Sequence, residues 1–279
     1  MLICRLSNKM SAIVDSQRKM EQKIGFVPTM GALHEGHLSL IRQSKKENDQ
    51  TICSIFVNPT QFNNPSDFEK YPITIEKDIM ALEEAGCDIL FLPSVTEIYP
   101  SDFKKETYSL GTLETILEGK HRPGHFQGVC QVVDRLLCII SCTNLYLGRK
   151  DYQQCMVIRQ LIHLRSHPVI VHTCETIREK DGLAMSSRNI RLSPAEREKA
   201  VCLVEALRLI QKNIQAGNLT SLIQEATSLL LANGLVVDYV ALTNQQLEPL
   251  DHWDGHTPVV GLIAASIHDI RLIDNMIVA

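Results

Sequence analysis

The sequence predicts an α/β protein: a parallel sheet covered by helices on both faces, followed by a smaller C-terminal α/β domain. Two observations support this fold class. Up to about residue 177, short apolar runs alternate with segments of helical periodicity. Apolar strands without a polar face are typical of parallel sheets buried on both sides, and their alternation with helices indicates βαβ units. A doubly wound, Rossmann-like sheet domain is therefore expected.

The elements of this first domain follow one another through short connections. The expected strands are apolar and rich in β-branched residues, and they cover residues 24–30, 51–58, 87–94, 144–148 and 169–177. The expected helices carry apolar residues at three- and four-residue spacing, and they cover residues 35–47, 73–85, 126–140 and 152–163. On the third of these helices an apolar stripe is expected to lie in the core, formed by Val132, Val133, Leu136, Leu137 and Ile140.

The pattern changes after residue 177, where an aperiodic polar loop is expected. Ser193, Pro194 and Glu196 then mark a helix start, as a cap, a first-turn proline and a capping-box glutamate. This helix is expected to run to about residue 216, with Gly217 as its C-terminal cap. A further helix and three strands are expected over residues 222–232, 236–243, 258–267 and 271–279. The predicted domains are therefore 1–177 and 178–279.

The composition excludes several classes of protein. The net charge is only −4, whereas a nucleic-acid-binding surface would be basic. No apolar run approaches the roughly 18–20 residues of a membrane span, and the N-terminus lacks the features of a signal peptide. The nine cysteines are irregularly spaced and form no CxxC, which favours reduced thiols in a cytoplasmic protein.

The first candidate site is the segment 28–38, which joins a predicted strand to a predicted helix. Ligands bind at such junctions in open α/β sheets. Gly31 and Gly36 let the backbone approach a ligand, and the N–H groups of a helix start suit phosphate. His34 and His37 lie three apart, so a helix presents both on one face, where they can donate to phosphate oxygens. Two alternatives stay open: local capping by the histidines, and a structural zinc site.

The second candidate site, residues 148–154, lies at another strand-to-helix junction. Lys150 could neutralise an α-phosphate, and Asp151 could accept hydrogen bonds from ribose hydroxyls. Gln154 could bond a substrate hydroxyl or carboxylate. Asp151 could instead cap the following helix.

The third candidate site is the polar loop over residues 181–189. Ser186, Ser187 and Arg188 place two hydroxyls and a guanidinium side by side, a combination that can hold nucleotide phosphates. In isolation, the same residues would fit an ordinary solvated loop.

Together these segments resemble a known family. HEGH at 34–37 resembles the HxGH motif of the nucleotidyltransferase superfamily, and DGLAMSSRN resembles the KMSKS-type loop that accompanies it. The whole set is similar to the pantothenate synthetase (pantoate–β-alanine ligase) family through SIFVNPTQF (54–62), YP (71–72), EIYP (97–100), LEGKHRPGHFQGV (117–129), LGRKDYQQ (147–154) and RLIDN (271–275). NPTQF, RPGHF and KDYQQ separate this family from cytidylyltransferases and nicotinamide-nucleotide adenylyltransferases.

The resemblance implies a two-step reaction. The carboxylate of pantoate attacks the α-phosphate of ATP, which gives pantoyl adenylate and pyrophosphate, and the amine of β-alanine then releases AMP and pantothenate. ATP is implied as a substrate and Mg²⁺ as its metal. The implied protein is a cytoplasmic homodimer whose partners are small molecules, with no nucleic acid or membrane.

The resemblance also implies roles by motif position. The residues implied to hold ATP are Met30, His34, Gly36, His37, Gly148, Lys150, Asp151, Met185, Ser186, Ser187 and Arg188, of which His34, His37 and Lys150 are implied to be catalytic. Those implied to hold pantoate are Met30, Gln61, Gln154, Asn58 and Arg122. Asp78 is a possible magnesium contact, or else an exposed helix residue, and Arg122 could simply belong to a tight turn. These residues are expected to converge on one cleft between the domains.

One position departs from the family pattern, and two other functions stay open. The family usually has an acid where this chain has Arg149, which puts the charge balance beside Lys150 in question. A nucleotidyltransferase acting on a phosphorylated acceptor would need further basic residues, whereas Gln61 and Gln154 favour a neutral, hydroxylated acid. A nucleotide-binding module without activity would be expected to lack a key histidine or basic residue, yet these are present.

Overall fold

The computed structural model describes residues 1–63 and 65–279, without the side chains of residues 65 and 66. The chain divides into two compact units, one formed by residues 1–149 and 153–175, the other by residues 150–152 and 176–279. The division after Glu175 lies close to the boundary expected after residue 177. The short segment Lys150–Tyr152 belongs to the second unit, although it follows a strand of the first.

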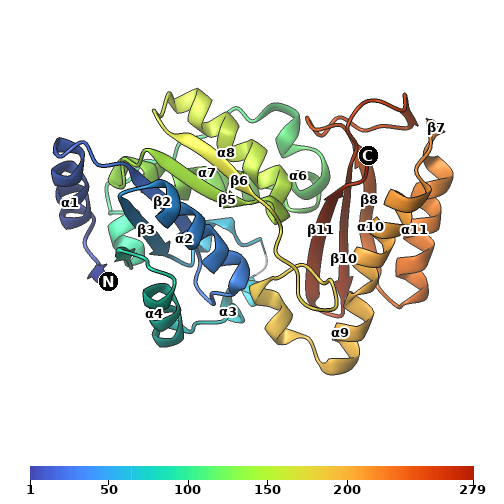
Figure 1. The fold of residues 1–279 in the computed structure, drawn as a ribbon, viewed down its shortest axis with the longest axis horizontal. Helices are drawn as coiled ribbons and strands as arrows, with labels where there is room; N and C mark the ends of the chain where they lie inside the picture. Colours follow the sequence, from blue (N-terminus) through green and yellow to red (C-terminus); the bar gives the residue numbers. More distant parts are fainter. Residues whose placement is uncertain (64) are drawn as a thin grey trace. The chain divides into compact units, whose positions relative to one another are not determined.

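The first unit is built on a six-stranded sheet in the order β1-β4-β3-β2-β5-β6. Figure 1 labels β2, β3, β5 and β6 of this sheet. All its pairings are parallel. Its strands are β1 (Leu2–Cys4), β2 (Ile24–Thr29), β3 (Gln50–Ile55), β4 (Ile89–Phe91), β5 (Asn144–Gly148) and β6 (Ile170–Cys174). The winding direction reverses between β2 and β5, and open α/β sheets bind ligands at the carboxyl ends of such strands. The predicted fold class is confirmed.

Helices cover both faces of this sheet. One core cluster joins Phe26 of β2 to α1 (Ser7–Lys19), α7 (His125–Ile139) and α8 (Tyr152–Arg165). A second cluster joins the adjacent Val27 to α2 (Glu35–Glu47) and α4 (Ile75–Glu84). The predicted apolar stripe of Val132, Val133, Leu136, Leu137 and Ile140 lies in the first cluster, as expected. Shorter elements are η1 (Pro59–Gln61), α3 (Pro65–Glu69), α5 (Val95–Ile98), η2 (Gly111–Glu114), α6 (Leu117–His121) and η3 (Arg149–Asp151).

The second unit packs helices against a small antiparallel sheet in the order β11-β10-β8. Its strands are β8 (Val236–Thr243), β10 (Val260–Ile267) and β11 (Ile270–Ile277), with a separate pair β7 (Gly217–Asn218) and β9 (His252–Trp253). Its helices are η4 (Ser187–Arg191), α9 (Pro194–Ala200), α10 (Cys202–Asn213) and α11 (Thr220–Ala232). No described helix combines the length and the apolar character of a membrane span.

The prediction of a single helix up to residue 216 is wrong. The segment forms two helices, which are divided at Val201. The second helix ends at Asn213, because Ile214 adopts an extended conformation and packs against the core of this unit. Gly217 is not a helix cap: it pairs with Trp253 in a two-stranded ribbon, with φ at +123°. Trp253 packs against the same core, and its indole N–H donates to the carbonyl of Thr257 at 2.7 Å.

The cysteines give a prediction about thiol reactivity. All nine are free, but only Cys138 is exposed and only Cys174 is half-buried. Burial raises the pKa of the thiols of Cys87, Cys130 and Cys142 to about 12, and the thiolate is the reactive form. We expect an aromatic disulfide reagent at pH 8 to label Cys138 first, then Cys174, and the remaining thiols only after unfolding. Cys138→Ser should remove the fastest phase, and rapid labelling of all nine thiols in the folded protein would contradict the burial.

Candidate active site

The turn after β2 has a strained backbone that a distant carboxylate holds in place. Gly31 and Ala32 both adopt positive φ, at +82° and +49°, which is uncommon for alanine. The carboxylate of Asp78, on α4, accepts the N–H of Ala32 at 2.9 Å and the N–H of Leu33 at 2.8 Å. The hydroxyl of Thr74 donates to the same carboxylate at 3.0 Å. Asp78 therefore fixes the turn that leads into α2.

This position corrects the expectation for Asp78. The side chain is not exposed, since only 2% of the residue is accessible. Both of its oxygens accept hydrogen bonds from the protein. This geometry favours a role in holding the turn over the predicted magnesium contact.

The two histidines of the motif lie against each other at the start of α2. His34 is the N-cap, and its backbone N–H donates to Nδ1 of His37 at 3.3 Å. Their ring centroids are 4.0 Å apart. Because Nδ1 of His37 accepts this bond, the neutral ring carries its proton on Nε2, the form that can donate to a phosphate oxygen. The alternative of local capping is thus correct, because the His37 ring caps the backbone N–H of His34. This capping leaves Nε2 of His37 able to donate to a phosphate oxygen.

Three of the residues predicted to hold pantoate form one hydrogen-bonded cluster. The amide of Gln61 donates to the sulfur of Met30 at 2.9 Å, and its oxygen accepts from the amide of Asn58 at 3.2 Å. Asn58 is 1% exposed, and its oxygen accepts hydrogen bonds from Thr60 and Tyr99. Asn58 therefore positions Gln61, a role that this geometry favours over the predicted contact with pantoate.

The carboxyl end of β5 leads into the second motif. A side chain added at Gly148 would meet no atom within 4 Å, so there is room for a ligand beside the backbone. The guanidinium of Arg149 pairs with Glu175 at 2.7 Å, which balances the charge of the residue that departs from the family pattern. Lys150 is half-buried, with its ammonium 3.7 Å from the carboxylate of Asp151. Gln154 lies half-buried in the first turn of α8.

Gln153, next to Gln154, has a role that sequence reasoning missed. It is 3% exposed, and its oxygen accepts the N–H of Glu118 at 2.9 Å. Its amide donates to the carbonyls of Leu113 and Ile116 at 2.8 and 3.0 Å. Gln153 thus ties the start of α8 to α6. The only sequence signal was its place in the KDYQQ motif.

The segment after α6 contains the tight turn considered for Arg122. Arg122 is the C-cap of α6, and Gly124 has a φ of +79°. The N–H of His125 donates to the carbonyl of Arg122 at 3.0 Å. The turn is confirmed, and a ligand contact by Arg122 stays a prediction.

The serine-rich segment of the second unit is structured, although the sequence indicated an aperiodic loop. Ser186 caps η4 by accepting the N–H of Arg188 at 3.3 Å. Asn189 donates to Glu179 at 2.8 Å and to the carbonyl of Ala184 at 3.0 Å. Arg197 binds the same Glu179 at 2.7 Å. The roles of Met185, Ser186, Ser187 and Arg188 toward ATP stay predictions, as does the convergence of all motif residues on one ligand.

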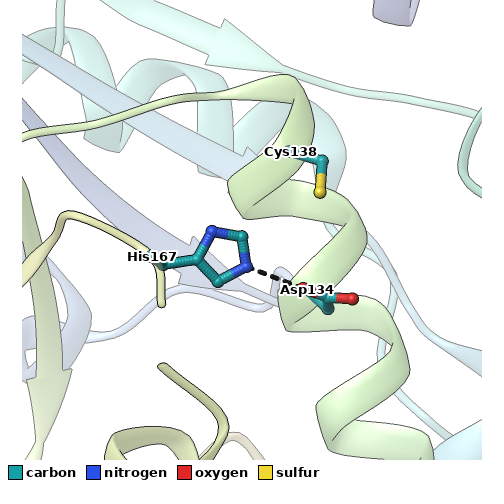
Figure 2. Close-up of side chains that lie close together, drawn as sticks. All are labelled: Asp134, Cys138 and His167. Atoms are coloured by element: carbon teal, nitrogen blue, oxygen red, sulfur yellow. Dashed lines mark hydrogen bonds and ion pairs between the residues drawn. The ribbon is translucent and has the colours of Figure 1, made fainter. Parts of the chain in front are cut away.

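One group of potential metal ligands occurs among the residues that the structure describes, formed by Asp134, Cys138 and His167 (Figure 2). Asp134 already binds His167 at 2.7 Å, Arg165 at 3.2 Å and the hydroxyl of Tyr108 at 3.0 Å. Although Cys138 is exposed as a residue, partial desolvation of its sulfur and the nearby charge of Asp134 raise the pKa of its thiol, which disfavours the thiolate that a metal needs. The guanidinium of Arg165 also lies beside Asp134. This group is therefore an ion-pair network that joins α7 to the end of α8. The histidines of the active-site motif belong to no such group in the described part of the chain.

The doubly wound parallel sheet carries the HEGH turn beside its switch point, which is where open α/β sheets bind ligands. The model of the family described as pantoate-beta-alanine ligase matches residues 2–277. The chain therefore belongs to this family and is a ligase.

Individual relatives agree with this assignment. The chain is 46% identical to the pantothenate synthetase of Cytophaga hutchinsonii over 94% of both chains. The crystal structure of pantothenate synthetase from Thermus thermophilus superimposes with a TM-score of 0.93 at 39% identity, covering 100% of this chain and 99% of that one. The Francisella tularensis pantoate-beta-alanine ligase, complexed with beta-gamma ATP and beta-alanine, gives a TM-score of 0.84 at 40% identity, covering 100% and 98%.

Proposed function

We propose that this chain joins pantoate to β-alanine at the expense of ATP, through a pantoyl adenylate. Family membership over residues 2–277 supports the proposal. The structural observation that carries it is the bond from Gln61 to Met30 at 2.9 Å. This bond links a residue suited to a hydroxylated acid to the turn that presents the two histidines. An acid held there would lie next to groups suited to phosphate.

In the first step, a carboxylate oxygen of pantoate attacks the α-phosphorus of ATP and pyrophosphate leaves. Such a displacement needs little covalent help from the protein, but it needs alignment and neutralisation of charge. His34, His37 and Lys150 are proposed to donate to phosphate oxygens in the transition state. The helix start of α2 adds backbone N–H groups and the positive end of its dipole.

In the second step, the amine of β-alanine attacks the acyl carbon of pantoyl adenylate. The carbon–nitrogen bond forms, the acyl–phosphate bond breaks, and AMP leaves with its electron pair while the amine loses a proton. The phosphate of AMP is a good leaving group, which explains why a carboxylate needs activation by ATP.

Further parts of the proposal concern the metal, the location and the assembly. The described residues offer no group of three acidic or histidine ligands around Asp78, so we propose that Mg²⁺ enters on the phosphates of ATP, where it would neutralise part of their charge. The nine free cysteines support a cytoplasmic location. Family resemblance supports a homodimer, which light scattering coupled to gel filtration would test.

The experiment that tests the function separates the two half-reactions. Pyrophosphate should be released from ATP with pantoate alone, and AMP and pantothenate should form when β-alanine is added. No release from folded protein that binds ATP would contradict the choice of pantoate, unless Arg149 has disabled the site. A screen of other carboxylates, run in parallel with Arg149→Glu, separates these two causes.

Gly128 gives a prediction about the pantoate cluster. A Cβ at this position of α7 would lie 2.3 Å from the carbonyl oxygen of Thr60, so Gly128→Ala must displace η1 and Gln61. We expect a several-fold higher KM for pantoate and a loss of about 1–3 kcal/mol of stability. Steady-state kinetics and thermal unfolding measure both effects.

The matched control is Gly261→Ala in the second unit, where the added Cβ would lie 3.0 Å from a side-chain atom of Leu207. It should lower the melting temperature without raising the KM for pantoate. If Gly128→Ala leaves the KM for pantoate unchanged, the cluster of Met30, Asn58 and Gln61 is not part of the pantoate site.

A further inference from the structure

Two buried polar residues near the end of β11, Asp274 and Asn275, have no assigned role. They belong to the RLIDN segment and are 2% and 5% exposed. A polar group buried in a sheet costs stability unless it is hydrogen-bonded, so the partners of these side chains show what they hold.

The side chain of Asn275 holds the backbone at Lys150. Its amide nitrogen donates to the carbonyl oxygen of Lys150 at 2.7 Å. This bond joins residues that are 125 positions apart in the sequence. It fixes the main chain from which the Lys150 side chain extends.

Asp274 and Asn275 also hold the base of the serine-rich segment, through Arg178. The guanidinium of Arg178 binds both oxygens of Asp274 at 2.7 and 3.0 Å, and it donates to the carbonyl of Asn275 at 3.2 Å. It further donates to the carbonyl of Gly182 at 3.1 Å. The backbone of Arg178 forms a bridge with Ala184, two residues before Ser186.

We propose that Asp274, Asn275 and Arg178 are positioning residues that hold Lys150 and the Ser186–Arg188 segment in a fixed relation. All of these residues belong to the second unit. Because the guanidinium of Arg178 binds both oxygens of Asp274, it fixes the orientation of the two side chains as well as their separation. Burial of Asp274 strengthens these hydrogen bonds. Two segments that bind phosphate would thus act as one preorganised group. The inference rests on the proposed function, which gives both segments their ligand.

Asn275→Asp tests the bond to Lys150. The variant keeps the shape of the side chain, removes the donor and sets a negative oxygen against the carbonyl of Lys150. We expect the first half-reaction, followed as pyrophosphate release at saturating ATP and pantoate, to slow by about 10- to 100-fold, because small displacements of a catalytic group have effects of this size. If this variant does not fold, Asn275→Ser replaces it, since its side chain is too short to make the bond.

The matched control is Asn233→Asp, at the end of α11. Its amide donates to the carbonyl of Leu229 at 2.9 Å, so the control loses the same kind of bond in the same unit. It should lower the melting temperature without slowing pyrophosphate release. Equal rates in the two variants would overturn the inference, because loss of the bond to Lys150 would then have no specific effect.

A double-variant cycle shows whether Asn275 acts through Lys150. If it does, Lys150→Ala together with Asn275→Asp should be no slower than Lys150→Ala alone, because coupled effects do not add. Additive losses would overturn the inference while leaving the function intact. If neither the unaltered protein nor Arg149→Glu releases pyrophosphate, the proposed function fails. ATP affinity measured by calorimetry then decides the inference: Asn275→Asp must weaken ATP binding more than Asn233→Asp.

Discussion

Replacing either His34 or Lys150 with alanine should slow pyrophosphate release from ATP and pantoate by about 100- to 1000-fold. Each side chain is proposed to donate to phosphate oxygens whose charge grows in the transition state. Neither belongs to an apolar core cluster, so the fold should survive. Rapid-quench measurement of the first half-reaction gives the rate, and circular dichroism checks the fold.

Lys45→Ala is a suitable control for charge, because Lys45 lies on the same helix as the histidine motif but pairs with Asp88 at 2.7 Å. It should retain the rate of the unaltered enzyme. Unchanged turnover in both His34→Ala and Lys150→Ala would remove the roles assigned to them. A larger effect on the KM for ATP than on kcat would indicate that they bind the ground state as tightly as the transition state.

The sequence was most informative where periodicity and flanking residues agreed. The helix over 35–47 and the strands over 144–148 and 236–243 were predicted with the bounds that the structure has. β1 was missed because it is only three residues long, and its residues Leu2 and Ile3 are 52% and 41% exposed. α1 was missed because its buried face consists of only Met10, Val14 and Gln17 in an otherwise polar segment.

The motifs also located the histidine turn, but they could not show what holds it. Asp78 lies 46 positions from Ala32, and Asn275 lies 125 positions from Lys150. Contacts of this range depend on how strands and helices pack, which spacing along one chain does not encode. From motif position alone, Asp78 was predicted to contact magnesium, and Asn275 was assigned no role. The packed structure reveals both as partners of backbone groups.

Asp78→Ala should destabilise the protein and disable the first half-reaction together. The substitution leaves the N–H groups of Ala32 and Leu33 without their carboxylate acceptor, at a cost of about 2–5 kcal/mol. Ala32 would then lose the bond to Asp78 that offsets its unfavourable φ of +49°, so the turn before His34 should relax. Urea unfolding measures the first effect and pyrophosphate release the second.

A magnesium titration of Asp78→Asn separates the two roles considered for this residue. The amide keeps the size of the side chain but can accept at only one of its two ends, so the turn is held less firmly. If Asp78 positions the turn, the rate should fall by about 10-fold or more at every Mg²⁺ concentration, with a lower unfolding midpoint. If it binds the metal instead, excess Mg²⁺ should restore the rate while stability stays unchanged. Asp88→Asn is the control, because Asp88 likewise accepts a distant backbone N–H, that of Thr51 at 2.8 Å, away from the turn.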